Sequence, residues 1–150
     1  RKCGTRMSPG EVTEFGDLCN VCGKRITLGV ANRIKELSTS LKPATIGLDG
    51  MVRNIHGRPP FRMLVSLRKI VSEALGFGIE TKTVNHFYMH LISELGNELE
   101  ILTNVKVKEI ENIVGDKIAE GIERVRLGRV EITPGFDGIY GSVKIWPMGK

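Results

Sequence analysis

Long apolar runs are missing from this sequence. No stretch approaches the ~18 consecutive apolar residues of a membrane span, and no positively charged segment precedes an apolar stretch as it does in a secretory signal. Both absences favour a soluble intracellular protein, which we expect to be cytoplasmic. At 150 residues the chain has the length of one ordinary domain or of two small ones.

Cysteine is also scarce, and its placement is informative. Cys3, Cys19 and Cys22 are the only cysteines of the chain, and all three lie in the opening segment. Cys19 and Cys22 have the C-x2-C spacing that closes around one tetrahedral ion. Glycine follows Cys3 and Cys22, and its left-handed backbone lets nearby amides point at a thiolate. The pattern predicts a zinc knuckle, so structural zinc is the expected cofactor.

Three cysteines leave one ligand position open. A leading cysteine for the first knuckle would stand one position before Arg1, so we expect the chain to be a fragment of a longer protein. The fourth ligand could also be water or His56, which is distant in sequence. Alternatively, the cysteines could form one disulfide plus a free thiol, or be small buried apolar groups. The paired spacing and the absence of a signal sequence favour a metal.

Positive charge is concentrated in the first part of the chain. Residues 1–62 contain 11 Lys and Arg against 5 Asp and Glu, whereas residues 63–150 contain 11 against 12. A basic half of this kind suits a surface that faces phosphates, although it also occurs in proteins that bind no nucleic acid.

Residues 38–58 carry no sustained hydrophobic period, and proline and glycine interrupt them, so we expect a loop or linker there. His56, Arg58 and Arg62 stand around a Pro-Pro pair that fixes an extended backbone. Two interpretations stay open. The segment could be a stiff entry to the next helix, or it could present two guanidiniums and an imidazole to phosphates.

Apolar residues recur at helical spacing through much of the chain. The pattern predicts helices over 27–37, 63–75, about 81–95, 106–113 and 117–126, with a further apolar segment at 98–102. In the first of these, Val30, Ile34 and Leu37 recur at i, i+4 and i+7, and we expect them to pack against the metal-binding segment. Residues 129–133 and 139–146 alternate like the strands of a β-hairpin.

The expected fold is therefore mainly α with small β elements. An N-terminal zinc-knuckle or zinc-ribbon lobe would cover residues 1–37, and a loop or linker would cover 38–58. A helical domain ending in a β-hairpin would cover 59–150.

Two helical patterns could carry chemistry, each with a simpler interpretation beside it. His86, His90 and Glu94 follow one another at four-residue spacing and would form an enzyme's metal site only if they lined a pocket. Phe87 stands where an H-E-x-x-H motif requires Glu, so a solvated helix face is favoured. Residues 114–116 could be the turn of a helix-hairpin-helix that holds a DNA phosphate. Because Lys117 replaces the second glycine of such a turn, an ordinary helical hairpin is favoured.

Short phrases spread in order along nearly the whole chain carry a family resemblance. They are CNVCG at 19–23, GV, R and EL at 29–30, 33 and 36–37, RPPF at 58–61, ALG at 74–76, TKTV at 81–84, GNE at 96–98, VRLG at 125–128 and PGFDGIYG at 134–141. Together they resemble the C-terminal region of the endonuclease Q family, which consists of a zinc-binding segment and a helical domain.

The resemblance implies DNA repair. Members of this family are endonucleases, hydrolases that cut a DNA strand on the 5′ side of a deaminated base or an abasic site. Their metal-dependent chemistry sits in an N-terminal PHP-type domain, whose His/Asp motifs are missing here. We therefore expect this chain to contain no catalytic residue and to work with a PHP-type catalytic domain as its partner.

The expected function is DNA binding and substrate positioning. Arg58, Arg62 and Lys82 are the first candidates for contacts to the DNA backbone, followed by His56 and Lys117. Two alternatives remain: a zinc-ribbon adaptor whose basic loop docks an acidic protein surface, and a segment of a helicase-like fusion protein.

Overall fold

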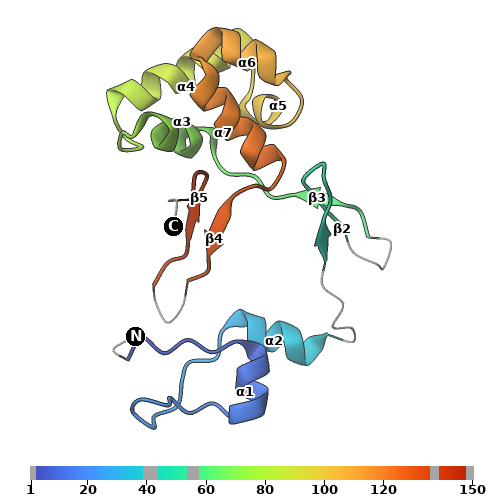
Figure 1. Ribbon diagram of the computed structural model, residues 1–150, viewed down its shortest axis with the longest axis vertical. Helices are drawn as coiled ribbons and strands as arrows, with labels where there is room; N and C mark the ends of the chain where they lie inside the picture. The colour runs from blue at the N-terminus through green and yellow to red at the C-terminus, as the bar shows by residue number, and fades with distance from the viewer. Residues whose placement is uncertain (1–2, 39–43, 54–57, 136–138, 148–150) are drawn as a thin grey trace. The chain divides into compact units, whose positions relative to one another are not determined.

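The structure is a computed structural model that describes residues 3–38, 44–53, 58–135 and 139–147. Within these residues the chain forms seven α-helices and small antiparallel sheets, so the predicted mainly helical fold class is confirmed (Figure 1). None of the described helices is long and apolar enough to cross a membrane. The chain divides into two units, one of residues 1–43 with 132–142 and one of residues 44–131 with 143–150.

The first unit contains α1 (Pro9–Phe15) and α2 (Val30–Leu37), with the cysteine-bearing turn between them. The helix α1 begins with a capping box, because the Ser8 backbone N–H donates to the Glu11 carboxylate at 2.6 Å and the Glu11 N–H donates to the Ser8 hydroxyl at 3.3 Å. The Lys35 ammonium of α2 donates to the Pro9 carbonyl at 3.1 Å. The link between the two helices is therefore partly polar.

The apolar face of α2 is exposed. Val30, Ile34 and Leu37 expose 77%, 62% and 65% of their surface. The prediction that this face packs against the metal-binding segment is therefore wrong. Because the polar face of α2, with Lys35, contacts α1, the apolar face is turned outward. The helix also begins at Val30 rather than at residue 27, since its N-cap Gly29 has an extended backbone.

The second unit is a bundle of five helices. They are α3 (Leu67–Leu75), α4 (Lys82–Leu95), α5 (Glu98–Thr103), α6 (Val107–Val114) and α7 (Asp116–Arg126). Each contributes side chains to one core, including the fully buried Leu67, Ile70, Leu91, Ile101, Ile110 and Ile122. Full burial of each such side chain contributes about 1.5–3 kcal/mol. Thr81 caps α4, since its side chain accepts the Val84 N–H at 3.4 Å.

Two charged side chains hold the helix ends of this bundle. The Arg126 guanidinium of α7 donates to the carbonyls of Ile101 and Leu102 at 2.5 and 3.2 Å, at the end of α5 where helical carbonyls lack partners. The Glu98 carboxylate of α5 accepts the Leu67 N–H at 2.8 Å, at the start of α3. The orphan groups of one helix are thus satisfied by side chains of another.

Strands occupy part of the predicted connecting segment and two residues that follow it. The strands β1 (Thr45–Ile46), β2 (Met51–Arg53) and β3 (Phe61–Arg62) form an antiparallel sheet in that order. They are too short for a period-2 pattern to indicate them. The strands β4 (Glu131–Thr133) and β5 (Ser142–Lys144) form the expected C-terminal pair. The three-part division of the chain at residues 37 and 58 stays a prediction.

Candidate metal centre and nucleic-acid interface

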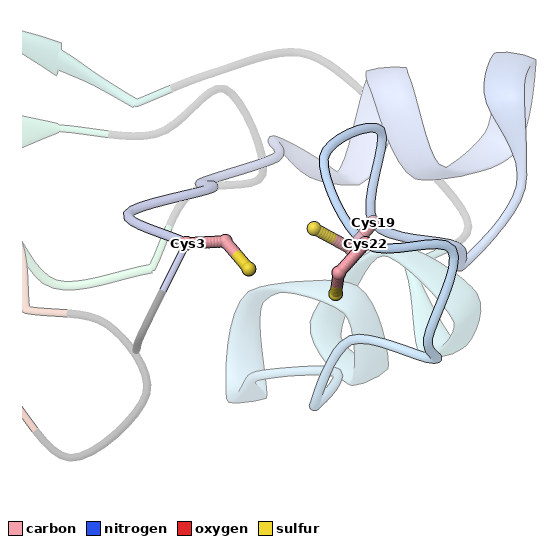
Figure 2. A group of neighbouring side chains, drawn as sticks. All are labelled: Cys3, Cys19 and Cys22. Atoms are coloured by element: carbon pink, nitrogen blue, oxygen red, sulfur yellow. The ribbon is translucent and has the colours of Figure 1, made fainter.

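The three cysteines gather at one point of the first unit. Their Sγ atoms all lie within 4.8 Å of one another, and Figure 2 shows that the side chains of Cys3, Cys19 and Cys22 converge. None of the three forms a disulfide. Gly4 and Gly23, which follow Cys3 and Cys22, have positive φ angles of 64° and 69°, as the knuckle pattern predicted.

Backbone hydrogen bonds shape the turn that carries Cys19 and Cys22. The Gly23 N–H donates to the Cys19 carbonyl, and the Cys19 N–H donates to the Lys24 carbonyl, both at 2.8 Å. A bridge between Leu18 and Arg25 closes the base of the turn. The C-x2-C pair is thus held in place by its own backbone.

Hydrogen bonds also make the Cys19 thiol more acidic than an ordinary cysteine. The Thr5 Oγ1 lies 3.2 Å from the Cys19 Sγ. This hydroxyl, together with the backbone N–H groups of Cys22 and Val21, lowers the pKa of the Cys19 thiol to about 6. A hydrogen bond with the Cys22 side chain, followed by burial and by the Cys19 sulfur, raises the pKa of the Cys3 thiol to about 11. The sulfurs compete for protons, and a cation among them would favour the thiolate form of all three.

The cluster fits a thiolate-binding metal. A tetrahedral ion with Zn–S bonds of 2.3 Å places its sulfurs about 3.8 Å apart, so the observed cluster needs only a small contraction. Among the described residues no fourth His, Cys, Asp or Glu joins the three cysteines. His56 lies outside the described residues, so its candidacy as the fourth ligand stays a prediction. Three close cysteines could therefore bind a metal ion.

A cavity of about 980 Å³ opens beside the cysteines. The basic residues Arg6, Lys24 and Arg25 line it, together with apolar side chains of the first unit such as Met7 and Ile26. The sequence does not indicate this cavity, because its lining comes from several separate segments. The basic residues on both sides of the cysteine pattern were the only available signal.

The predicted DNA-contacting residues have different surroundings. Arg58 and Lys82 are exposed, and neither has a side-chain partner among the described residues; Lys82 is the first residue of α4. Arg62 is half-buried on β3 and donates to the Asp49 carbonyl at 3.2 Å. The Lys117 ammonium lies 3.4 Å from the Glu120 carboxylate and 4.4 Å from the Trp146 ring centroid. His56 lies outside the described residues.

The structure brings none of Arg58, Lys82 and Lys117 into contact with one another within the part of the chain that it describes. Burial lowers the pKa of the Arg126 guanidinium, and the positive charge of the nearby Arg62 lowers it further. Arg62 and Lys117 already have partners within the fold, so Arg58 and Lys82 are the more available cations.

The structure favours the simpler interpretation of the two helical patterns on α4 and at the start of α7. His86, His90 and Glu94 are exposed on α4, in agreement with a solvated helix face. At the start of α7, the Asp116 carboxylate accepts the Lys117 backbone N–H at 2.8 Å. A carboxylate thus stands where a hairpin would hold a phosphate, which favours an ordinary helical hairpin.

Comparisons with known proteins agree with this architecture. Residues 66–129 match the family described as the MJ0043 C-terminal domain. The protein MJ0043 of Methanocaldococcus jannaschii is 34% identical over 147 residues, which are 98% of this chain and 17% of that protein. YqxK of Bacillus subtilis is 27% identical over 143 residues, which are 95% of this chain and 30% of that protein. The chain therefore spans less than a third of the length of these relatives.

Two solved structures share the fold. One is the lesion-specific endonuclease PfuEndoQ from Pyrococcus furiosus, with a TM-score of 0.73 and 30% identity. The other is endonuclease Q in complex with a 27-mer duplex substrate that has an abasic lesion at the active site, with a TM-score of 0.69 and 27% identity. Each match covers 95% of this chain and 33% of the solved chain.

Proposed function

This chain shares its sequence pattern and its fold with the C-terminal region of the endonuclease Q family, and from that premise we propose that it is the non-catalytic, DNA-positioning part of a repair nuclease. The parent protein would cut on the 5′ side of deaminated bases or abasic sites, using a PHP-type catalytic domain. The observation that carries the proposal is the fold match over 95% of the chain to an endonuclease Q bound to an abasic duplex.

The proposal assigns a structural zinc ion to Cys3, Cys19 and Cys22. Cys19 is the only buried apolar side chain among the described residues of the first unit. A unit of this size without an apolar core usually depends on a metal or on disulfides for its stability, and these cysteines form no disulfide. Zinc would supply the cross-link that holds the N-terminal turn to the C-x2-C turn.

The proposal also assigns backbone contacts to DNA. Arg58 and Lys82 are exposed cations on the second unit with no acceptor among the described residues. Contacts from such side chains to phosphates give affinity that does not depend on sequence. Arg62, Lys117 and His56 are secondary candidates, since the first two also hold partners within the fold.

The test is an anisotropy titration of the zinc-loaded chain with a labelled duplex that contains one abasic site or deoxyinosine, at several salt concentrations. The logarithm of the association constant should fall linearly with the logarithm of the salt concentration. Arg58→Glu and Lys82→Glu should each weaken binding, and each lost phosphate contact should reduce the slope by about 0.9.

Lys108→Glu is the matched control, because Lys108 is an exposed lysine of α6 that already pairs with Glu111 at 2.9 Å. It changes the net charge by the same amount outside the proposed contacts and should leave the slope unchanged. Absent binding, or binding that does not depend on salt, would overturn the proposal.

A zinc-dependent adaptor for another protein is the second candidate. The exposed apolar face of α2, formed by Val30, Ile34 and Leu37, favours it, since adjacent exposed apolar side chains on one helix are typical of protein-binding surfaces. If Ile34→Asp leaves the DNA titration unchanged, this face takes no part in DNA binding and remains available to a protein.

A further inference from the structure

The turn between β1 and β2 exposes an apolar side chain completely. Leu48 stands in this turn, and its relative exposure is 100%. Turns of this kind are usually made of Gly, Asn, Asp, Ser and Pro, and the neighbours of Leu48 follow that rule, whereas Leu48 does not. No packing among the described residues accounts for a leucine at this position.

The turn that carries Leu48 is held by its own hydrogen bonds. The Gly50 N–H donates to the Gly47 carbonyl, and the Gly47 N–H donates to the Met51 carbonyl, both at 2.9 Å. The Asp49 carboxylate accepts a hydrogen bond from the Met51 N–H at 3.1 Å. It also accepts hydrogen bonds from both terminal nitrogens of Arg53, at 2.8 and 2.5 Å. These hydrogen bonds therefore hold the backbone around Leu48 in one conformation.

The turn is also anchored on the helical bundle of the second unit. Gly50 is buried, with φ at 74°, and a Cβ added to it would lie 1.8 Å from the carbonyl oxygen of Arg126. The Arg62 guanidinium donates to the Asp49 carbonyl at 3.2 Å, and Val52, which follows in β2, is buried. These contacts fix the turn that carries Leu48 to the helical bundle.

Two arginines stand on the strands next to the turn of Leu48, Arg53 on β2 and Arg62 on β3. Met51 pairs with Arg62 across the sheet, and Arg53 lies two residues from Met51, so both arginines stand on one face of the sheet. Their two charges exceed the single charge of Asp49 between them. An apolar side chain flanked by arginines is the combination with which proteins enter a DNA groove and separate neighbouring bases.

We propose that Leu48 is an apolar wedge that enters the base stack of DNA at the lesion, while Arg53 and Arg62 face the adjoining phosphates. This inference rests on the proposed DNA-positioning function. An abasic site leaves a gap in the stack that a leucine side chain can fill, and a mismatched deaminated base unstacks at lower cost than a normal pair. Filling that gap removes the apolar surface of Leu48 from water, which supplies a preference for damaged DNA without reading its sequence.

The test compares the zinc-loaded chain with Leu48→Ala on two duplexes, one intact and one with an abasic site beside 2-aminopurine. Binding of the unmodified chain should raise the 2-aminopurine fluorescence, because the inserted leucine separates that base from the base that stacks on it across the abasic position. Leu48→Ala should bind the intact duplex with an affinity within about twofold of the unmodified chain. It should lose the fluorescence rise and about tenfold of its affinity for the abasic duplex.

Leu99→Ala is the matched control, since Leu99 is a leucine of α5 with 63% exposure, and it should change neither readout. If Leu48→Ala keeps the fluorescence rise and the preference for the abasic duplex, the wedge is overturned while the DNA-positioning function stands. If the unmodified chain binds neither duplex, that function fails and the wedge fails with it.

Discussion

Glu73 in α3 accepts a hydrogen bond from the backbone N–H of Ile145 at 2.7 Å, although 72 residues separate them in the sequence. The same carboxylate oxygen accepts the Trp146 N–H at 3.1 Å, and the Lys69 ammonium lies 3.2 Å from the other oxygen. Ile145 is completely buried among the helices. One carboxylate therefore holds the end of the C-terminal hairpin on the helical bundle.

Replacing this carboxylate should loosen the hairpin. Glu73→Ala should lower the free energy of unfolding by about 1.5–3 kcal/mol, because two buried backbone donors lose a charged acceptor. Urea denaturation measures the change. Glu94→Ala, an exposed position of α4, is the control and should stay within about 0.5 kcal/mol. Equal effects of the two substitutions would contradict the role of Glu73.

The same carboxylate should make stability depend on pH. Burial opposes its ionisation, but the backbone N–H groups of Trp146 and Ile145 and the Lys69 ammonium outweigh burial and lower the pKa of Glu73. A lowered pKa in the folded state contributes stability above the unfolded value of about 4.3. That contribution is lost as the pH falls through the folded value. Glu73→Gln should flatten this part of the stability profile, as denaturation between pH 3 and 6 would measure.

Close packing against Arg126 should make Gly50 irreplaceable. Gly50→Ala meets both the positive φ of 74° and the carbonyl oxygen of Arg126, and should cost about 4 kcal/mol or more. Gly76→Ala separates the two effects, because Gly76 has a φ of 71° with no atom within 4 Å. It should cost only about 1–2 kcal/mol. Similar thermal shifts for the two variants would show that the contact with Arg126 is unimportant.

The helices that sequence analysis predicted best are those that share one core. Apolar residues such as Ile70, Leu91 and Ile122 recur on one side of their helices, and that side is the buried one. The helix α1 has no such stripe, and it was missed. Its capping box at Ser8 and Glu11 was the signal that could have revealed it.

Periodicity shows which residues share a face but not what that face contacts. The stripe on α2 has helical spacing like the others, yet it is exposed, because burial depends on a partner surface that no local pattern specifies. The cysteine cluster was predictable because C-x2-C spacing places two ligands within one short turn. The contacts of Arg62 with Asp49 and of Lys117 with Trp146 were not predictable, because these partners come together only through the tertiary fold.

A paired substitution tests this contrast between helix faces. Ile122→Ala removes a fully buried side chain from α7 and should cost about 2–5 kcal/mol in the free energy of unfolding. Ile34→Ala on α2 should change it by less than about 0.5 kcal/mol, since Ile34 is mostly solvated. Chemical denaturation followed by circular dichroism measures both. A large loss at Ile34 would mean that the face of α2 is covered in solution.

Removal of the metal should affect the two units unequally. Zinc-loaded protein should contain one ion per chain, and a chelator should abolish the protection of α1 and α2 in hydrogen exchange while α3 to α7 stay protected. The reason is that the apolar core lies in the second unit, whereas ligand binding supplies the folding free energy of a small metal-held unit. Unchanged exchange of α1 and α2 after chelation would contradict a structural metal.

Thr5 tests whether the arrangement around the cysteines serves a metal. Its hydroxyl lies 3.2 Å from the Cys19 Sγ, so Thr5→Val keeps the shape of the side chain and removes the hydrogen bond. Loss of a hydrogen bond that orients a ligand should weaken zinc affinity by about 10–100-fold, measured by competition with a chromophoric chelator. Thr13→Val is the control, because Thr13 lies on α1 and bonds to Pro9 and Lys35 instead of to sulfur. It should leave zinc affinity unchanged, and equal affinity in all three proteins would show that the Thr5 hydroxyl contributes nothing to the site.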